Sequence, residues 1–242
     1  MLMSFVFAFS ACSSDNGAPE NQENNEISTG TGEQKLTYFL PEPKSDGNTS
    51  VEKALVNRRS HRNFQDKAIS EEQLSQILWA AYGVTSPNPD DPGQRGGLRT
   101  APSAGALYPL EVYAIVGSVE GISPGVYRYI SGGHIIERVV EGDVRNDIRE
   151  AALGQSMVSQ APVSLFYSAV FERTTGRYGD NGEKYVYIEA GHSAQNVYLQ
   201  AEALGLGTCA IGALTGGRVS EILKLPENEV PLYLLPVGYY DG

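Results

Sequence analysis

The chain has 242 residues, a hydrophobic fraction of 41% and 14 tyrosines, which is enough apolar material for one large folded domain. Its formal net charge of −11 at pH 7 argues against nucleic acid or an anionic membrane surface as a partner. There are two cysteines, no Cys-x-x-Cys pair and no run of histidines, so the sequence predicts neither a disulfide framework nor a metal site.

The chain opens with a short apolar segment that ends at a cysteine. Residues 2–11 are apolar or small, and Phe9-Ser10-Ala11-Cys12 resembles a bacterial lipobox, in which Cys12 would be acylated. The run is too short to span a bilayer, which needs about 20 residues. It also lacks a Lys or Arg in front, and a buried N-terminal strand is the alternative interpretation.

The segment that follows is polar. Residues 13–35 are rich in Ser, Asn, Glu, Gly and Gln, a composition that buries too little apolar surface to fold. We therefore predict a lipoprotein-type signal segment (1–12), a flexible tether (13–48) and a folded domain (49–242). This organisation predicts a lipoprotein on the extracytoplasmic side of a bacterial cell, held to the membrane only through its lipid. A cytoplasmic location is the alternative.

Capping patterns and apolar periodicity predict the helices. Capping-box spacing occurs at 49–52 and at 70–73, so a helix is expected to begin after each. The longest predicted helix runs over roughly 184–204, because apolar residues recur there at helical spacing. Shorter helices are expected after Asp143 and near 219–223.

Strands are predicted from alternating or continuous apolar runs at residues 111–117, 126–130, 135–140, 163–171 and 230–237. Residues 84–100 contain three prolines and several glycines and are predicted to be a loop. Helices and strands follow one another without strict βαβ alternation. This order predicts the α+β class, with a central mixed or antiparallel sheet flanked by helices.

The sequence Arg58-Arg59-Ser60-His61-Arg62 is a basic cluster in an acidic chain. Arginine is a planar fork that bonds phosphate oxygens in pairs, so three guanidinium groups and a hydroxyl could surround a phosphate. The alternative is a solvated helix end, where arginine complements the helix dipole. Composition alone favours that alternative.

Two segments carry a resemblance to a known family. Arg-Arg-Ser-x-Arg-x-Phe before a capped helix resembles the opening motif of the nitroreductase family, and residues 100–109 (TAPSAGALYP) resemble its second flavin segment. The first likeness implies that the FMN phosphate and ribityl chain are held by Arg58, Arg59, Ser60 and Arg62. The second implies contacts to the isoalloxazine ring from Pro102, Ser103, Ala104, Gly105 and Ala106.

A third block is similar to the SagB/ThcOx branch of the family. It comprises Arg177-Tyr178-Gly179 and the stretch from Ile188 to Ala213, and the three blocks follow one another in family order over roughly residues 50–240. The resemblance implies a nitroreductase-like fold and further flavin contacts from Ile211, Gly212 and Ala213. A plain helix-to-strand connection is the alternative for these three residues.

The branch includes oxidases that convert thiazoline and oxazoline rings in peptides to aromatic azoles, with a Lys-Tyr pair for proton removal. The nearest pairs are Arg177-Tyr178 and Lys184-Tyr185, and the local register favours the first. Arginine is a poor base because its pKa stays above about 12. Tyr178 is therefore the candidate catalytic residue, as a proton donor; a tyrosine that only packs is the alternative. Glu189 and His192 have ligand-like spacing, but we interpret His192 as a buried packing group.

The resemblance implies an FMN-dependent oxidoreductase that transfers hydride or electrons between a donor and a small organic acceptor. Two alternatives stay open: a flavin oxidase of peptide thiazoline or oxazoline rings, and a non-catalytic flavin-binding lipoprotein. The family also implies a homodimer with FMN at the subunit interface. The expected substrate is a small molecule or a peptide, and neither nucleic acid nor a metal ion is expected to bind.

Overall fold

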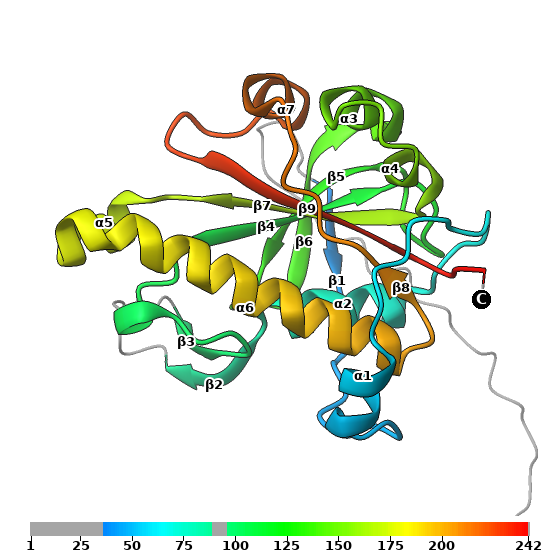
Figure 1. Ribbon diagram of the computed structural model, residues 1–242, viewed down its shortest axis with the longest axis horizontal. Helices are drawn as coiled ribbons and strands as arrows, with labels where there is room; N and C mark the ends of the chain where they lie inside the picture. The colour runs from blue at the N-terminus through cyan, green and yellow to red at the C-terminus, as the bar shows by residue number, and fades with distance from the viewer. Residues whose placement is uncertain (1–35, 89–95, 242) are drawn as a thin grey trace, which may run out of the picture.

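The computed structural model describes residues 36–88 and 96–241 of the chain. A seven-stranded sheet runs through the molecule in the order β1-β6-β5-β4-β7-β9-β8, and helices cover both of its faces (Figure 1). Each neighbouring pair of strands is antiparallel. The strands span Thr37–Phe39 (β1), Leu110–Val116 (β4), Gly125–Ile130 (β5), Ile135–Glu141 (β6), Val163–Ala169 (β7), Gly207–Thr208 (β8) and Val230–Gly238 (β9).

The helices form a layer on each face of the sheet. On one face, α2 (Glu71–Tyr82) and the long α6 (Gly182–Ala203) pack together, and α1 (Val51–Asn57) lies against α6. The opposite face carries α3 (Arg145–Ala151), α4 (Met157–Gln160) and α7 (Gly216–Leu223) (Figure 1). This arrangement confirms the predicted α+β class with a sheet flanked by helices.

The central strands supply both cores because successive side chains of a strand point to opposite faces. Val112 and Ala114 of β4 belong to the core under α2 and α6, whereas Tyr113 and Ile115 belong to the core under α3 and α7. All of β4 and β7 is buried, which explains the nearly continuous apolar sequence of the predicted strand at 163–171.

The remaining elements lie around the end of α6. α5 (Glu172–Tyr178) and the 3-10 turn η3 (Gly179–Asn181) connect β7 to α6. A separate two-stranded ribbon consists of β2 (Val84–Asn88) and β3 (Gly96–Arg99), and the 3-10 turn η2 (Ala104–Ala106) follows it.

Of the two capping boxes predicted from the sequence, the structure contains one. The capping box of Ser70 and Gln73 is confirmed, with the side chain of each residue bonded to the backbone N–H of the other. The predicted box at 49–52 is wrong by one residue, because the side chain that caps α1 is Ser50, which accepts from the Lys53 N–H at 3.2 Å. Thr49 and Ser50 are both residue types that cap helices, so the sequence alone could not show which of the two is the cap.

The prediction of a loop over 84–100 is wrong for most of its described residues. β2 and β3 pair as a hairpin in which Pro87 lies opposite Gly97. A two-stranded ribbon has only edge strands, so a proline without an N–H is tolerated there. Gly97 has φ of +130° and its α-carbon lies close to the Ser86 carbonyl, so a side chain at this position would clash.

The predicted boundary between tether and domain at residue 49 is also wrong. β1 pairs with β6, Leu40 is buried, and the Ser75 hydroxyl donates to the Pro41 carbonyl. The fold therefore includes the end of the segment that we predicted to be a tether. The signal segment, Cys12 and the rest of the tether lie outside the described residues. Within the described ranges, no helix is both long and apolar enough to cross a membrane.

Candidate functional site

The basic segment lies directly after α1 and runs beside β8. Ser60 and Thr208 form an isolated parallel bridge, and the His61 N–H donates to the Thr208 carbonyl at 3.0 Å. The His61 ring stacks on Tyr240 with centroids 3.6 Å apart. The fold thus brings the first motif of the chain against the third, as a shared site requires.

The three arginines of this segment have different surroundings. Arg59 donates from Nη1 to the carbonyls of Val56 at 2.9 Å and Arg58 at 2.8 Å, so it caps the C-terminal end of α1. The alternative interpretation of the cluster as a helix end is therefore correct for Arg59 Nη1, one of the two terminal nitrogens of that guanidinium group. The Arg58 guanidinium lies 5.5 Å from the ring centroid of Tyr198 on α6. Arg62 is exposed.

The arginines of the cluster form no ion pair with a carboxylate of the described residues. Among the residues that the structure describes, the ion pairs involve other arginines, and Arg58, Arg59 and Arg62 have no carboxylate partner. In a chain of net charge −11, three adjacent arginines without an acidic partner are a favourable site for an anion.

Hydroxyl and amide groups adjoin the arginines. The Tyr198 hydroxyl accepts from the Ala210 N–H at 2.8 Å and lies 3.1 Å from the Ser60 Oγ. The buried Thr208 Oγ1 has no hydrogen-bond partner within the described chain. Buried hydroxyls are rarely left unsatisfied. Ser60, Thr208 and the arginines therefore fit the phosphate and ribityl groups of a flavin nucleotide.

The segment after β8 divides into a buried and an exposed part. Ile211 exchanges both backbone hydrogen bonds with Leu234, and its side chain packs into the core beneath α3 and α7. Gly212 and Ala213 are exposed. A side-chain contact between Ile211 and a flavin ring, which the resemblance implied, does not agree with this burial, and a ring contact here would fall on Gly212 and Ala213.

The second motif forms a turn with unusual backbone angles. Gly105 has φ of +63°, and Ala106 and Tyr108 have φ of +55° and +48°. A non-glycine residue in this left-handed region costs roughly 1–3 kcal/mol, so neighbouring contacts must hold the turn. One such contact is the Ser103 Oγ, which accepts from the Tyr108 N–H at 2.9 Å.

The candidate catalytic tyrosine lies against this turn. A β-carbon added to Gly105 would lie 2.8 Å from the Tyr178 hydroxyl and 3.1 Å from the Arg177 Nη1. The end of α5 therefore places both residues of the predicted pair beside the glycine of the second motif. Tyr178 also packs edge-on against Tyr185, with centroids 5.1 Å apart.

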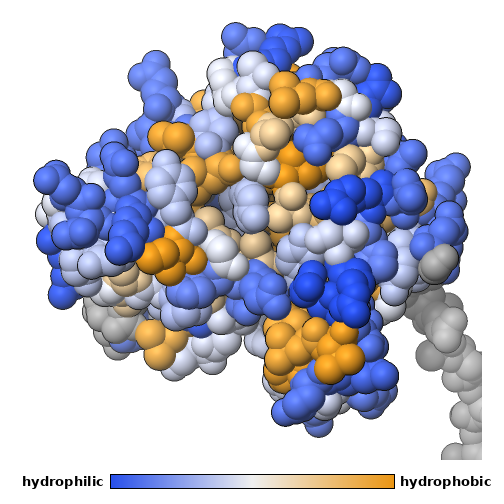
Figure 2. All heavy atoms as spheres, viewed as in Figure 1, coloured by the Kyte–Doolittle hydropathy of each residue, from blue (hydrophilic) through white to orange (hydrophobic). Residues whose placement is uncertain are grey.

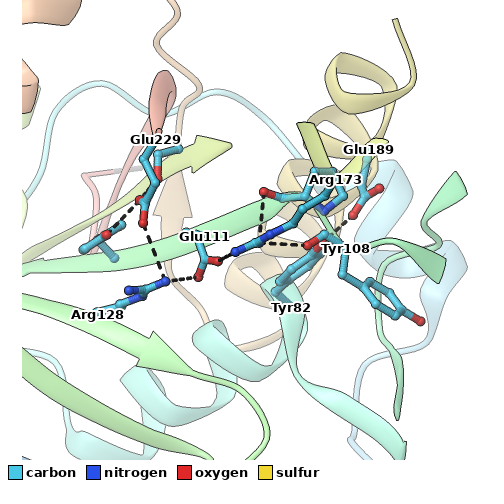
Figure 3. A network of polar contacts seen from close by, with 10 residues as sticks. Tyr82, Tyr108, Glu111, Arg128, Arg173, Glu189 and Glu229 are labelled. Atoms are coloured by element: carbon cyan, nitrogen blue, oxygen red, sulfur yellow. Dashed lines mark hydrogen bonds and ion pairs between the residues drawn. The ribbon is translucent and has the colours of Figure 1, made fainter. Parts of the chain in front are cut away.

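A buried carboxylate that sequence reasoning did not place in the site lies next to the same turn. Glu189 is 2% exposed, and the Tyr82 hydroxyl donates to its Oε1 at 2.5 Å (Figure 3). Burial raises the pKa of Glu189 to about 7, although hydrogen bonds from Ser103 and Tyr82 and the charge of Arg99 oppose the shift. Its helical spacing with the apolar residues of the long helix is the local signal, but that spacing does not separate a buried glutamate from a solvated one.

The prediction for His192 is wrong. Its side chain is exposed, and the buried polar residues of this part of α6 are Glu189 and Ser193 instead. The Ser193 hydroxyl donates to the Ala81 carbonyl at 2.7 Å. The buried face of the helix is the apolar one that its sequence spacing predicts, and it also includes these two polar side chains, which bond to partners on α2.

The long helix connects the parts of the site. Glu189 adjoins the turn at 102–108, Asn196 donates to the Thr100 carbonyl at 3.2 Å, and Tyr198 binds the segment that carries the arginines. Tyr198 follows Glu189 by nine positions along α6, which corresponds to a rise of about 13 Å. The arginine cluster and the turn therefore lie at separate points along this helix. This separation fits contacts to the two ends of one elongated ligand.

Comparison with known proteins agrees with this arrangement. Residues 55–239 match the sequence profile of the nitroreductase family. The chain belongs to the nitroreductase family.

This member of the family is similar to several known proteins. A Methanocaldococcus jannaschii protein that is named as a nitroreductase is 46% identical over 188 residues, which cover 78% of this chain and 90% of that protein. An NAD(P)H-dependent FMN reductase of Bacillus subtilis is 28% identical over 204 residues, 78% of this chain and 65% of that one. A chain of the Escherichia coli microcin synthetase McbBCD complex, solved with truncated pro-MccB17 bound, superposes with a TM-score of 0.64 and 26% identity, over 87% of this chain and 80% of that one.

Proposed function

We propose that this protein is an FMN-dependent oxidoreductase that transfers hydride or electrons between a donor and a small organic acceptor. The observation that carries the proposal is the arginine cluster, which forms no ion pair within the described part of the chain, beside the unsatisfied Thr208 hydroxyl. The name of the Bacillus subtilis relative, an FMN reductase, supports the same cofactor.

The residues divide by their role toward FMN. Arg58, Arg62 and the Ser60 hydroxyl would hold the phosphate, while Arg59 shares its fork with the end of α1. The turn at 102–106 and the exposed pair Gly212 and Ala213 would contact the ring, where the absence of large side chains permits close approach. Bound FMN would supply the redox chemistry, which the protein orients and tunes.

The role proposed for Tyr178 is to hold a proton at its hydroxyl for the acceptor. The residue is half-buried at the end of α5, and its hydroxyl lies against Gly105. A donor needs to reach the group that it protonates, and the turn at 102–106 would place the ring next to this hydroxyl. Arg177 is exposed and would hold a positive charge there.

The experiment that tests the proposal is a titration of the flavin-free protein with FMN, followed by fluorescence. We expect saturable binding that the substitution Arg62→Ala weakens and that Arg149→Ala, at an exposed arginine on α3, does not. Reduction of the bound flavin and reoxidation by a quinone or nitro compound would establish turnover. Absence of saturable binding by the unsubstituted protein contradicts the proposal.

We propose a homodimer with FMN at the subunit interface, and apolar surface supports it. Val51, Leu55 and Val56 of α1 are exposed, and Figure 2 shows an apolar patch over this helix. Tyr187 and Ile188 expose a second apolar area on α6. Exposed apolar patches mark interaction sites. Sedimentation of the purified protein tests the proposal, and a monomer at all concentrations contradicts it.

A peptide-heterocycle oxidase is the second candidate function. The likeness to a chain of the microcin synthetase complex, which was solved with a pro-peptide bound, favours it. The position of Arg177 and Tyr178 beside the turn is compatible with a proton transfer, but the arginine is a weak base. Conversion of a thiazoline-containing peptide to the thiazole, read as a loss of two mass units, distinguishes this function from reduction of a small acceptor.

We also propose that the mature protein is acylated on Cys12 and attached to the extracytoplasmic side of the membrane. The support is the apolar run that ends in the lipobox-like tetrapeptide. The protein with Cys12→Ser should then leave the membrane fraction. If as much of the variant as of the unsubstituted protein stays in the membrane fraction, the proposed lipid anchor is contradicted.

A further inference from the structure

A chain of four charged side chains runs from the sheet to α5. Glu229 lies before β9, Arg128 on β5, Glu111 on β4 and Arg173 on α5, and the charges alternate in sign along the chain (Figure 3). The Arg128 Nη2 lies 3.6 Å from Glu229 and 2.9 Å from the Glu111 Oε2. The Arg173 Nη2 lies 2.6 Å from the other oxygen, Glu111 Oε1.

Glu111, in the middle of this row of charged side chains, is held in place by its two arginine partners. Glu111 is 7% exposed and shares its carboxylate between two arginines. Burial raises the pKa of Glu111, but the charges and hydrogen bonds of Arg128 and Arg173 outweigh burial and hold the pKa below its ordinary value. Glu229 also accepts from the Tyr113 and Ser168 hydroxyls. Glu111 is therefore a fixed, ionised support for both arginines, and Glu229 is held in place by its own hydrogen bonds.

The last arginine also contacts the end of the second motif. Arg173 donates from Nη1 to the Tyr108 carbonyl at 3.2 Å and lies at 3.5 Å from that of Pro109. Tyr108 is one of the left-handed residues of the turn, so its conformation needs such support. Arg173 thus binds a buried carboxylate and the strained turn with the same planar fork.

The same arginine orients the helix that carries the candidate tyrosine. Arg173 lies in the first turn of α5, and Arg177 follows four residues later on the same face. Arg177 and Tyr178 meet the turn at Gly105, at the opposite end of the short helix. The helix is therefore attached to the turn at both of its ends, through Tyr108 and through Gly105.

We infer that Arg173, supported by Glu111, is a positioning residue that holds the turn at 102–109 and the Tyr178 hydroxyl in register. The functional consequence of this inference rests on the proposed function, because a flavin ring would be bound beside these two groups. We call the contacts of Arg173 with Glu111 and with the Tyr108 carbonyl the clamp. The clamp does not depend on flavin, so its effect can be measured in the flavin-free protein.

The test uses Arg173→Lys, which keeps the positive charge beside Glu111 and removes the fork. The matched control is Arg145→Lys. Arg145 has a side-chain exposure of 20%, close to the 21% of Arg173, and it too joins a carboxylate, Asp143, to a backbone carbonyl, that of Ala161. It lies on α3, on the opposite face of the sheet, away from the turn.

Hydrogen exchange of the flavin-free proteins is the first measurement. We expect Arg173→Lys to raise amide exchange in peptides covering 102–110 and 172–180 by roughly fivefold, and to leave the rest of the sheet unchanged. Arg145→Lys should leave both peptides at the rate of the unsubstituted protein. Unchanged exchange in Arg173→Lys, or an equal increase in the control, overturns the inference. If Arg173→Lys does not fold, Arg173→Gln combined with Glu111→Gln removes both charges and is measured in the same way.

Flavin binding is the second measurement. The expected result is an FMN dissociation constant about tenfold higher in Arg173→Lys than in Arg145→Lys, and a turnover loss that is not additive with that of Tyr178→Phe. Equal dissociation constants and additive turnover losses would show that Arg173 does not position the site. If the unsubstituted protein binds no FMN, the proposed function fails, whereas the exchange measurement still decides whether the clamp exists.

Discussion

The Tyr178 hydroxyl lies against the α-carbon of Gly105, so that a β-carbon on this glycine would come within 2.8 Å of the oxygen. The contact joins the end of α5 to the turn of the second motif. It explains why a glycine is needed there for two independent reasons, the left-handed φ of +63° and the lack of space.

This contact makes Gly105→Ala a destabilising change with a measurable steric part. Gly154 is a matched control, because it has φ of +74° and no heavy atom within 4 Å of an added β-carbon. Both substitutions should lower the free energy of unfolding by about 1–2 kcal/mol for the backbone, and Gly105→Ala by about 1 kcal/mol more. Chemical denaturation measures both. Adding Tyr178→Phe should recover part of the extra loss, and equal losses at the two glycines would contradict the contact.

The arginine cluster allows two effects to be separated. Arg62 is exposed and makes no capping contact, so Arg62→Ala should weaken FMN binding at least tenfold at nearly unchanged stability. Arg59→Ala should weaken binding and also lower the free energy of unfolding by about 1 kcal/mol, because it removes the bonds to the last carbonyls of α1. Fluorescence titration and thermal unfolding measure the two effects. Full flavin affinity in both variants would place the phosphate elsewhere.

Removal of the Tyr178 hydroxyl tests its role as proton donor. Tyr178→Phe should lower turnover of a small acceptor about a hundredfold and leave the FMN dissociation constant nearly unchanged. Tyr187→Phe is the control, because Tyr187 lies on α6 with 57% of its surface exposed. Steady-state kinetics with both variants provides the comparison. If the two variants turn over at the same rate, Tyr178 has only a packing role.

Glu189 predicts a pH dependence of stability. Its pKa is raised from 4.5 to about 7 in the folded chain, so between these values the folded chain holds a proton that the unfolded chain releases. The contribution of Glu189 to the free energy of unfolding is therefore largest below pH 4.5 and falls as the pH rises toward 7. The total loss is roughly 3 kcal/mol.

The variant Glu189→Gln should lack this component. The difference in the free energy of unfolding between Glu189→Gln and the unsubstituted protein should shift in favour of the variant as the pH rises from 4.5 to 8. Denaturant titrations at several pH values measure it. A constant difference over that range would mean that Glu189 is ionised throughout, held by the Tyr82 and Ser103 hydroxyls.

The elements that sequence reasoning predicted well depend on local signals. The capping box of Ser70 and Gln73 and the buried strand β7 follow from residues a few positions apart. The arginine cluster was identified by its residue types, whereas its neighbour Thr208 was found only in the structure.

What sequence reasoning missed depends on distant partners. β1 has only three residues and is fixed by pairing with β6, so its polar surroundings indicated a tether. The hairpin of β2 and β3 tolerates proline because both strands are edges. The burial of Glu189 depends on Tyr82, which precedes it by 107 residues on another helix. No pattern within the long helix distinguishes such a glutamate from a solvated one.

The central claim is that the arginine cluster and the turn at 102–106 bind FMN. The most direct measurement is the absorbance spectrum and released-cofactor mass of the protein purified without residues 1–35, before and after addition of FMN. The account predicts a yellow protein that holds one FMN per chain and loses it on Arg62→Ala. A colourless protein whose flavin absorbance does not rise with added FMN would contradict it.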